Sequence, residues 1–258
     1  MIQLQQLAGD EKILQSRFQD AIDTARLKSQ IKFIGFLDLR QQEILDASTA
    51  SAGFESCRLY GGFPEAERKI AGFFPDYMDP DEQPADFFPV VALTAQFRTQ
   101  DKLTHRDFLG SLMGLRISRE MVGDILVTDG LAVLFVLEPV VPLILDELKK
   151  VGRVGVSLSK GARDLDQIRP VVEPLNGTVH SQRLDAVVAF LTRLSREKAQ
   201  ELIRQELVKV NGQVRTDVAG QIEEKSRLSI RGYGKYIIDA FDGVTKKGRL
   251  RIVAGHYQ

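Results

Sequence analysis

Hydrophobic residues recur at helical spacing near the start of the chain. Residues 10–28 carry apolar side chains three or four positions apart, which predicts an amphipathic helix: Ile13, Leu14, Phe18, Ala21, Ile22 and Ala25. A second helix is predicted over 39–47, and a strand over 56–60 leads into a double glycine. Residues 65–68 suit either a short helix or a loop. The pattern predicts an N-terminal α/β domain over residues 1–78.

Four prolines within fifteen residues interrupt this pattern: Pro75, Pro80, Pro84 and Pro89. Proline lacks an N–H and restricts the residue before it, so neither a helix nor a central strand is expected there. The stretch is also acidic, which predicts a linker or a long surface loop. A second break is predicted over 161–181, where Pro170, Pro174 and the turn pair Asn176-Gly177 occur.

The middle of the chain alternates strand-like and helix-like patterns. Apolar runs predict strands over 90–97, 124–127, 132–137 and 153–159. One helix is predicted from the N-cap Thr104 to about residue 115, and another from Pro139 or Pro142 to about residue 150. The order β-α-β-β-α-β over residues 88–162 predicts a ferredoxin-like, RRM-like domain. The aromatic signature with which RRM sheets stack bases is missing, and Phe135 is expected in the core.

The C-terminal third begins with two short amphipathic helices. The first is predicted from Arg183 and the second from the N-cap Ser195. Strands are predicted over 208–210, 213–214 and 228–230, and Asn211-Gly212 is the strongest hairpin signal in the chain. These elements predict a third domain over residues 180–240 with a strand extension to 258. The fold class is therefore α+β, with three small domains.

Composition narrows the class of protein. The chain has 258 residues, of which 43% are hydrophobic and 27% charged, and this excludes a wholly disordered or fibrous chain. No apolar run approaches ~18 residues, so no membrane span is expected, and the first residues lack the pattern of a signal peptide. Cys57 stands alone, which excludes an intrachain disulfide framework and a cysteine zinc cluster. A cytoplasmic monomer is expected.

A net charge of zero conceals a gradient along the chain. Residues 1–89 hold 9 Lys+Arg against 15 Asp+Glu, residues 90–180 hold 11 of each, and residues 181–258 hold 15 against 9. A basic C-terminal third predicts a surface that binds a polyanion such as RNA. A solvated basic face without a ligand is the alternative.

The basic third carries three short motifs in order. Arg183-Leu184-Asp185, Ser195-Arg196-x-x-Ala199 and Val208-Lys209-Val210-Asn211-Gly212 resemble the S4 RNA-binding domain, over about residues 182–235. The resemblance implies an αL-type RNA-binding fold. Two positions depart from that family, because Glu206 stands where a glycine is usual and Lys225-Ser226 replaces a Gly-Asp pair. The carboxylate of Glu206 is expected to weaken phosphate contact nearby.

Blocks elsewhere in the chain narrow the resemblance. Residues 61–68 (GGFPEAER), 104–110 (THRDFLG) and 119–125 (REMVGDI) are similar to signature blocks of the bacterial YlmH family, and Arg231-Gly232-x-Gly-Lys235 also fits. The resemblance covers nearly the whole chain. It implies a ribosome-associated, non-enzymatic RNA-binding protein with rRNA or tRNA and the large ribosomal subunit as partners, in quality control or translation. It also implies a gene neighbourhood of cell-division proteins.

RNA binding needs cations for phosphates and donors that tolerate backbone shape. Arg183 and Arg196 begin two adjacent helices, where the helix dipole also attracts anions. The predicted RNA-binding set is Arg183, Leu184, Ser195, Arg196, Ala199, Arg204, Lys209, Asn211, Gly212, Arg231 and Lys235. Within it Leu184 and Ala199 are expected in the core. Asp185, outside the set, is expected to orient an arginine or cap a helix rather than contact a phosphate. Replacing Arg183 and Arg196 is expected to leave the fold intact.

Three arginines of the middle domain form a predicted secondary contact with RNA or a partner: Arg106, Arg116 and Arg119. No catalytic constellation is visible. His105, His180 and His256 are far apart and lack a metal-ligand spacing, so no metal site, cofactor or catalytic residue is predicted. Glu67 and Arg68 are expected to form a structural ion pair at a turn, with a functional pair in the loop as the alternative. Two alternatives stay open: an RNA-modifying enzyme or its accessory, of pseudouridine synthase or methyltransferase type, and an interaction protein linked to cell division.

Overall fold

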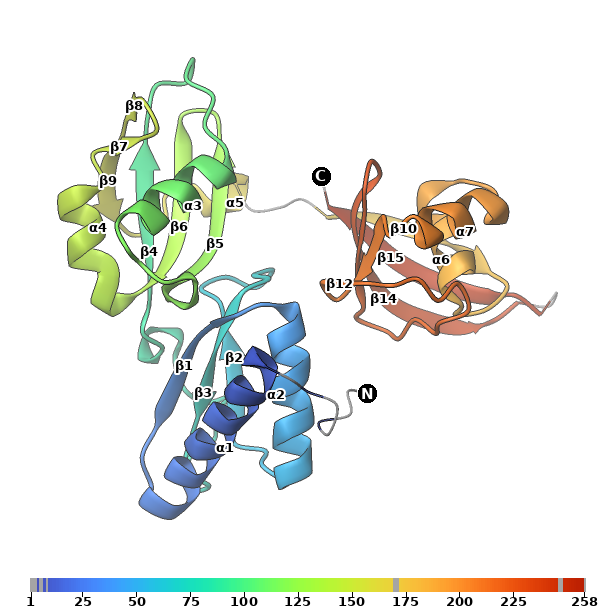
Figure 1. The fold of residues 1–258 in the computed structure, drawn as a ribbon, viewed down its shortest axis with the longest axis horizontal. Coiled ribbons are helices and arrows are strands. Elements are labelled where there is room, and N and C mark those ends of the chain that lie inside the picture. The colour runs from blue at the N-terminus through green and yellow to red at the C-terminus, as the bar shows by residue number, and fades with distance from the viewer. Residues whose placement is uncertain (1–3, 5–6, 8, 169–171, 246–247, 258) are drawn as a thin grey trace. The chain divides into compact units, whose positions relative to one another are not determined.

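The chain folds into two compact units, Met1–Arg169 (unit 1) and Pro170–Gln258 (unit 2) (Figure 1). The computed structural model describes residues 4 and 7 and the ranges 9–168, 172–245 and 248–257. Both units contain helices and antiparallel sheets, so the predicted α+β fold class is confirmed. The predicted limits of the three domains stay predictions, since two of those domains share unit 1.

The first half of unit 1 is a three-stranded antiparallel sheet in the order β1-β3-β2, covered on one face by two helices (Figure 1). Its elements are α1 (Asp10–Lys28), β1 (Lys32–Leu37), α2 (Leu39–Ala52), β2 (Cys57–Tyr60) and β3 (Lys69–Phe73). The first predicted helix is confirmed at both ends. The second is confirmed but longer than predicted, beginning with a capping box between Asp38 and Gln41. Residues 65–68 form a loop.

Strands β1 and β3 were not predicted, because neither alternates apolar and polar residues. Ile34 and Phe36 of β1 are both buried, but they belong to two different hydrophobic clusters on opposite sides of the sheet. In β3, Ala71 and Ile70 are likewise both buried and belong to these two clusters, respectively. A strand buried on both faces reads as a short apolar run, which sequence periodicity alone does not assign.

The second half of unit 1 has the predicted ferredoxin-like order. Its four-stranded sheet is antiparallel, in the order β5-β6-β4-β9, with α3 and α4 packed on one face. The elements are η2 (Ala85–Phe87), β4 (Val90–Gln96), α3 (His105–Gly114), η3 (Arg119–Met121), β5 (Val122–Thr128), β6 (Leu131–Leu137), η4 (Glu138–Val140), α4 (Val141–Glu147), β9 (Ser157–Lys160) and α5 (Leu165–Ile168).

The predicted last strand of this half, 153–159, is wrong in its extent. Residues Val154–Gly155 (β8) instead pair with Lys150–Val151 (β7) in a separate two-stranded hairpin, and β9 begins only at Ser157. Gly152, at the turn between β7 and β8, has a φ of 58°. The chain therefore turns at 152–153 and leaves the hairpin at Val156, where the sequence predicted one continuous strand.

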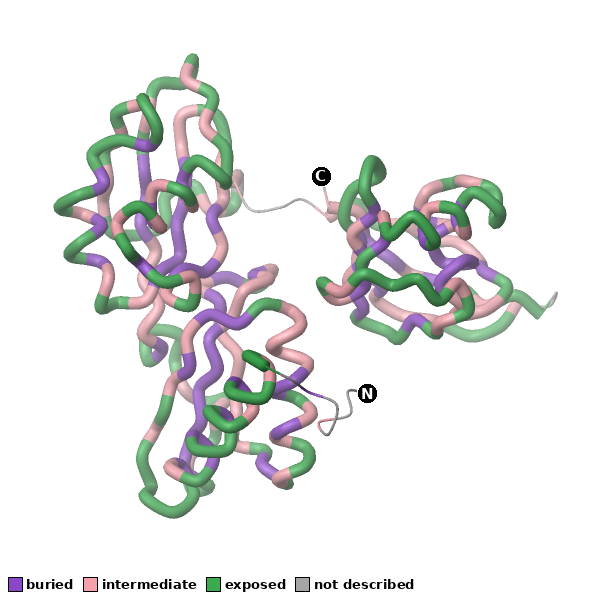
Figure 2. The backbone as a smooth tube through the Cα atoms, in the orientation of Figure 1, coloured by how far each residue is buried: buried purple, intermediate pink, exposed green. Residues whose placement is uncertain are grey.

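A shared hydrophobic cluster joins the two halves of unit 1. It contains Phe36 and Ile70 from the first sheet and Val133 and Phe135 from β6 of the second. Phe63, which follows the double glycine, stacks on Phe135 with ring centroids 4.9 Å apart. Figure 2 shows buried positions running along the strands of both halves. Phe135 is thus a core residue as predicted, and the sheet face on which RRM domains stack bases is closed by the first half.

The proline-rich stretch crosses this junction as a loop, as predicted. Arg58 fastens it, because its Nη1 donates to the carbonyl oxygens of Pro80 at 2.9 Å and Gln83 at 2.7 Å. The Arg58 guanidinium also lies over the ring of Phe88, 5.3 Å from its centroid. The stretch contains only the single 3-10 turn η2 as regular structure, and the hydrogen bonds to Arg58 help to fix the path of the loop.

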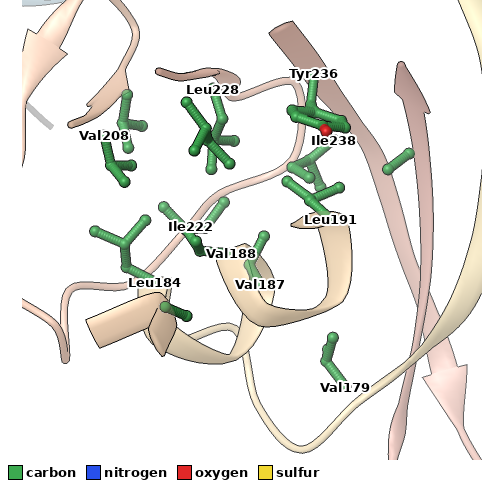
Figure 3. Packing of buried hydrophobic residues seen from close by; sticks show 14 of the residues in the cluster. Val179, Leu184, Val187, Val188, Leu191, Val208, Ile222, Leu228, Tyr236 and Ile238 are labelled. Atoms are coloured by element: carbon green, nitrogen blue, oxygen red, sulfur yellow. The ribbon is translucent and has the colours of Figure 1, made fainter. Parts of the chain in front are cut away.

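Unit 2 is a six-stranded antiparallel sheet in the order β10-β15-β14-β13-β11-β12, with two helices on its buried face. In Figure 3 the apolar side chains of α6 point toward strand residues such as Val208, Leu228 and Ile238. The elements are β10 (Val172–Val179), α6 (Leu184–Thr192), α7 (Arg196–Arg204), β11 (Val208–Val210), β12 (Gln213–Val214), β13 (Arg227–Ile230), β14 (Gly234–Val244) and β15 (Leu250–Tyr257).

The predicted turn at Asn176-Gly177 is wrong. Both residues lie inside β10, where they pair with Val253 and Ile252 of β15. A Cβ on Gly177 would lie 2.3 Å from Cε2 of Phe190, so a close approach of α6 explains this glycine. The sheet of unit 2 therefore begins before residue 180, and residues 169–171 of the predicted break lie outside the described residues.

The junction in unit 1 yields a prediction about Gly62. Its φ is 97°, and a Cβ there would lie 2.2 Å from Cδ1 of the buried Phe135. Gly62→Ala should lower the free energy of unfolding of unit 1 by about 2 kcal/mol or more, from backbone strain and overpacking. Urea denaturation followed by circular dichroism measures it.

Gly110→Ala is the matched control, since Gly110 lies in α3 and nothing stands within 4 Å of its Cβ position. It should stabilise the helix by up to about 1 kcal/mol. Equal urea midpoints for both variants would contradict the close packing of Gly62 against Phe135.

Candidate RNA-binding surface

A buried carboxylate lies at the start of the two helices of unit 2. Asp185 is the second residue of α6 and is 0% exposed. The loop from Val218 to Gly220 closes over it, because the backbone N–H groups of Leu184 and Asp185 donate to the carbonyls of Gly220 at 2.8 Å and Val218 at 3.1 Å. The local fold thus removes this side chain from water.

Two arginines hold the carboxylate in bidentate geometry. Nε and Nη2 of Arg183 donate to the two Asp185 oxygens at 3.2 and 3.1 Å, and Nε and Nη2 of Arg196 do so at 3.0 and 3.0 Å. Nε2 of Gln200 adds a fifth hydrogen bond at 2.8 Å. We call Arg183, Asp185, Arg196 and Gln200 the arginine clamp. The expectation that Asp185 orients an arginine is confirmed, and it orients two.

The electrostatics of the clamp follow from this geometry. Burial raises the pKa of Asp185, but the hydrogen bonds from Arg183, Arg196 and Gln200 outweigh burial and hold that pKa well below its usual range. The carboxylate is therefore ionised at neutral pH and fixes both guanidinium groups. Two positive charges around one negative charge leave the clamp with a net positive charge.

The clamp keeps part of each guanidinium accessible. The Arg183 and Arg196 side chains are 36% and 47% exposed. They stand at the N-terminal ends of α6 and α7, where helix dipoles favour anions. Arg204, at the end of α7, is exposed, and its Nη2 lies 3.5 Å from Oε1 of Gln200. Rigid, half-exposed guanidinium groups suit recognition of phosphate oxygens.

Gln200 was missed by the sequence analysis. Its signal was its position four residues after Arg196, which places both side chains on one face of α7. Ser195 caps α7 as predicted, accepting from the N–H of Lys198 at 3.3 Å. Leu184 and Ala199 are 1% and 0% exposed, so these members of the predicted set hold the helices on the core and present no side chain to a ligand.

The predicted lysines lie on the other face of the sheet. Lys209 lies between the buried Val208 and Val210, so it points away from the helices. It pairs with Ser229, which pairs with Lys235, and the three form one row across β11, β13 and β14. We call Lys209, Ser229 and Lys235 the lysine row. The structure therefore does not bring the lysines onto the surface of the arginine clamp.

The predicted hairpin turn lies at the end of β11. Asn211 and Gly212 have φ values of 49° and 82°, as a type I′ turn requires. Oδ1 of Asn211 accepts from the N–H of Arg227 at 2.8 Å, which ties the turn to β13. Arg231 is exposed after β13, and its backbone N–H donates to the carbonyl of Leu207 at 2.9 Å.

The two departures from the S4 pattern fall on positions with unusual backbone. Glu206 has a φ of 60° and Lys225 a φ of 63°, in the left-handed region that glycine adopts without steric cost. A glycine at these positions in the family thus has a backbone reason. Both side chains are exposed, so this chain keeps the loop paths with residues that are strained there.

The three arginines of unit 1 are not equivalent. Arg106 and Arg116 are exposed, at the start of α3 and just after its end. Arg119 is turned inward, and its Nη1 donates to the carbonyl oxygens of Val122 and Gly123. Of the predicted secondary contact, only the first two present their charges openly to solvent.

Other candidate chemistry is limited. Burial, and then the carboxylate of Asp46, raise the pKa of the Cys57 thiol to about 12, so the thiol is protonated at neutral pH. The Arg68 guanidinium donates to the backbone carbonyls of Val122 and Phe36, and the backbone N–H of Glu67 donates to Asp124. The ion pair between Glu67 and Arg68 stays a prediction. Among the described residues, no cluster of metal-ligating side chains occurs and no helix has the length and apolar composition to span a membrane.

Known proteins match the chain over most of its length. The family models described as "Putative RNA-binding domain in YlmH" and "S4 domain" match residues 88–164 and 182–227. A Bacillus subtilis (strain 168) protein named "Ribosome-associated protein quality control protein P2" is 36% identical over 225 residues, 86% of this chain and 86% of that protein. The solved "Cell division protein ylmH from Streptococcus pneumoniae" is 23% identical with a TM-score of 0.53, covering 65% of this chain and 98% of that one, which shows a shared fold.

The clamp changes what is expected of the double variant Arg183→Ala with Arg196→Ala. Removing both arginines leaves the buried Asp185 with only Gln200 as a side-chain partner. The melting temperature of unit 2 should fall by about 10 °C or more, because a buried charge loses its partners. This corrects the expectation of an intact fold. Thermal melts followed by circular dichroism measure it, and an unchanged melting temperature would contradict the clamp.

The stability of unit 2 should depend on Asp185 at acid pH. The pKa of Asp185 is lower in the folded than in the unfolded chain, where it is about 3.9. Its stabilisation is therefore complete above about pH 5 and is lost as pH falls through 4 toward the folded pKa. Asp185→Asn should lower the melting temperature by several degrees at pH 6, and the difference from the natural protein should narrow by pH 3.

Asp239→Asn is the control for this pH dependence. Asp239 is 41% exposed, and its salt bridge with Lys225 is 3.8 Å long. Its substitution should change the melting temperature little at either pH. A constant difference between the natural protein and Asp185→Asn from pH 6 to pH 3 would refute the low pKa.

Proposed function

The chain belongs to the YlmH family, and from that membership and the arginine clamp we propose that it is a non-enzymatic RNA-binding protein that acts on the ribosome. The support is a relative at 36% identity named as a ribosome-associated quality control protein, together with two matching RNA-binding domain models. The proposal assigns rRNA or tRNA on the large ribosomal subunit as the ligand. We also propose that the chain is a cytoplasmic monomer and acts in translation quality control.

The arginine clamp is the observation that carries the proposal. RNA binding through a folded module needs cations held in place and aimed outward, because ordering a free arginine on contact costs conformational entropy. Asp185 meets that need for Arg183 and Arg196 before RNA arrives. The basic balance of residues 181–258, 15 Lys+Arg against 9 Asp+Glu, supplies the attraction at longer range.

We propose that the RNA contact is centred on the clamp and reaches Arg204, Arg231 and the Asn211-Gly212 turn. The lysine row, on the other face of the sheet, is proposed as an extension of this contact around the sheet. The clamp presents rigid guanidinium groups, whereas the lysine row presents point charges. A shape-dependent contact at the helices and a weaker electrostatic contact at the row fit these side chains.

Unit 1 is proposed to add a second, weaker contact. Because its RRM-like sheet face is occupied by Phe63 and its neighbours, base stacking on Phe135 is not part of the proposal. Arg106 and Arg116 instead offer exposed charge at the two ends of α3. Linked to the clamp by one chain, even weak contacts raise the combined affinity through effective concentration.

An interaction role linked to cell division is the second candidate. It rests on the solved relative from Streptococcus pneumoniae, which is named a cell division protein. At 23% identity that likeness concerns the fold, so the ribosomal proposal takes precedence. An RNA-modifying enzyme is not proposed, since the matching models and the curated relative are named for RNA binding and ribosome association.

The proposal predicts a salt dependence with a defined change in slope. RNA binding by the full chain should weaken steeply with salt, and Arg204→Ala should reduce the log–log slope by about 0.7–0.9 if one phosphate contact is lost. Fluorescence anisotropy with large-subunit rRNA fragments at several salt concentrations measures the slope. Lys102→Ala, an exposed lysine of unit 1 paired with Asp129 at 2.8 Å, is the charge-matched control and should leave the slope unchanged.

Lys209→Ala in the same titration tests the extension over the lysine row. A slope reduced by one contact supports it, and an unchanged slope confines RNA to the helix side. A slope near zero for the natural protein, or no binding at low salt, would refute the proposed function itself.

A further inference from the structure

A pocket of about 330 Å³ opens between the two halves of unit 1. The end of β1 and the start of α2 form one wall, the loop before β3 forms another, and η3 closes the third. Its polar lining consists of Asp38, Gln41, Arg68, Ser118, Arg119 and Glu120. Small-molecule sites begin at about this volume, so the pocket suits a compact ligand.

Two guanidinium groups stand side by side in this lining. Nε of Arg68 and Nη1 of Arg119 both donate to the carbonyl oxygen of Val122. Nη2 of Arg68 also donates to the carbonyl of Phe36 at 2.6 Å. In the part of the chain that the structure describes, neither guanidinium has a salt bridge.

Among the described residues, the charge of this arginine pair is compensated only by Asp38 and Asp124, carboxylates that attract both guanidinium groups without forming a salt bridge with either. Burial, and then the neighbouring Arg119, lower the pKa of Arg68 to about 10, so both arginines stay protonated at neutral pH and repel each other. Backbone carbonyls satisfy some of their donors but supply no full negative charge. An anion between the two groups would relieve this repulsion.

The carboxylates of the pocket are already engaged elsewhere. Asp38 accepts from the N–H of Gln41 at 2.9 Å, as part of the capping box of α2. Glu120 pairs with Arg17 at 3.1 Å. Glu120 is thus paired with an arginine outside the pocket lining, and Asp38 caps a helix N-terminus without a salt bridge to Arg68 or Arg119.

Hydrogen-bond donors in the same pocket are unused. Nη1 of Arg68, Nη2 of Arg119, Nε2 of Gln41 and the hydroxyl of Ser118 donate to no described residue in the contacts of the structure. The fully buried polar atoms that lack a hydrogen-bond partner lie in residues that do not line the pocket. All four donors belong to residues that line the pocket.

We propose that this pocket binds a phosphate group, with Arg68 and Arg119 supplying the charge and Gln41 and Ser118 supplying further donors. Paired guanidinium groups match phosphate oxygens in both charge and geometry. The phosphate belongs either to an RNA backbone or to a small phosphorylated molecule. The site lies wholly in unit 1, so it does not rest on the RNA contact proposed for unit 2.

Calorimetric titration of inorganic phosphate into the full chain at constant ionic strength tests the proposal. Ser118→Asp places a carboxylate in the pocket, and the fold should tolerate it because Ser118 is the exposed N-cap of η3, where aspartate is favoured. Gln100→Glu adds the same charge at an exposed position outside the pocket. Saturable binding is expected for the natural protein and Gln100→Glu, and at least tenfold weaker binding for Ser118→Asp.

Phosphate also stabilises proteins without binding to a site, and the difference between the two variants removes that general effect. Nitrogen-15 spectra of the arginine side chains give a second measurement that needs no variant. Phosphate should shift the Nε–H signals of Arg68 and Arg119. No saturable binding by the natural protein, equal affinity for both variants, or unmoved Arg68 and Arg119 signals would overturn the proposal.

Binding of one rRNA fragment by the natural protein and by Ser118→Asp distinguishes the two sources of phosphate. If both Ser118→Asp and added phosphate lower the affinity for RNA, the pocket is assigned to a phosphate of the RNA backbone. If Ser118→Asp leaves RNA affinity unchanged while the natural protein binds phosphate, the pocket is assigned to a small phosphorylated molecule. If Arg204→Ala weakens RNA binding but leaves phosphate binding unchanged, the phosphate site in unit 1 is independent of the RNA contact in unit 2.

Discussion

One buried carboxylate organises the candidate RNA-binding surface. Asp185 has no exposed area, yet it holds two guanidinium groups in bidentate hydrogen bonds and receives a fifth from Gln200. Burying a charge is costly unless it is paired and hydrogen-bonded, so the carboxylate requires the arginines as much as it orients them. The need to pair this buried charge fixes the position of the first turns of α6 and α7. It also fixes the position of the loop over 218–220. The three charges that stabilise this part of the fold are therefore also the ones that we propose as the centre of the RNA contact.

The second constraint is the shared core of unit 1. Two antiparallel sheets, each covered by helices on one face, bury their other faces together through Phe36, Phe63 and Phe135. This packing covers the second face of each sheet, since the helices of each half cover only the first. It also removes the RRM-like face from RNA. A fold that elsewhere reads bases is here used for packing, and the charged features of unit 1 lie at the ends of α3 and in the pocket at the junction.

Two of the blocks that resemble the YlmH family meet at this junction. Residues 61–68 and 119–125 contact each other through hydrogen bonds from the N–H groups of Glu67 and Arg68 to Asp124, at 2.6 and 3.2 Å. The same blocks supply Arg68 and Arg119, the two arginines of the proposed phosphate pocket. A double glycine is needed there because Gly62 lies against Phe135 in a left-handed conformation. Signature residues of unit 1 thus serve the contact between its two halves.

The sequence by itself determined the helices, the ferredoxin-like order, the S4 motifs and the identity of the clamp arginines. Those features depend on local periodicity, caps and turn residues, which lie within a few positions of one another. Only the tertiary structure decided that β1, β3 and β10 are strands, that Lys209 and Lys235 lie on the face away from Arg196, and that Arg119 points inward. These depend on what packs on each face of a sheet, and contacts between residues far apart in the chain leave no local pattern. The sequence therefore identified the charged side chains, and the packing decided which of them share a surface.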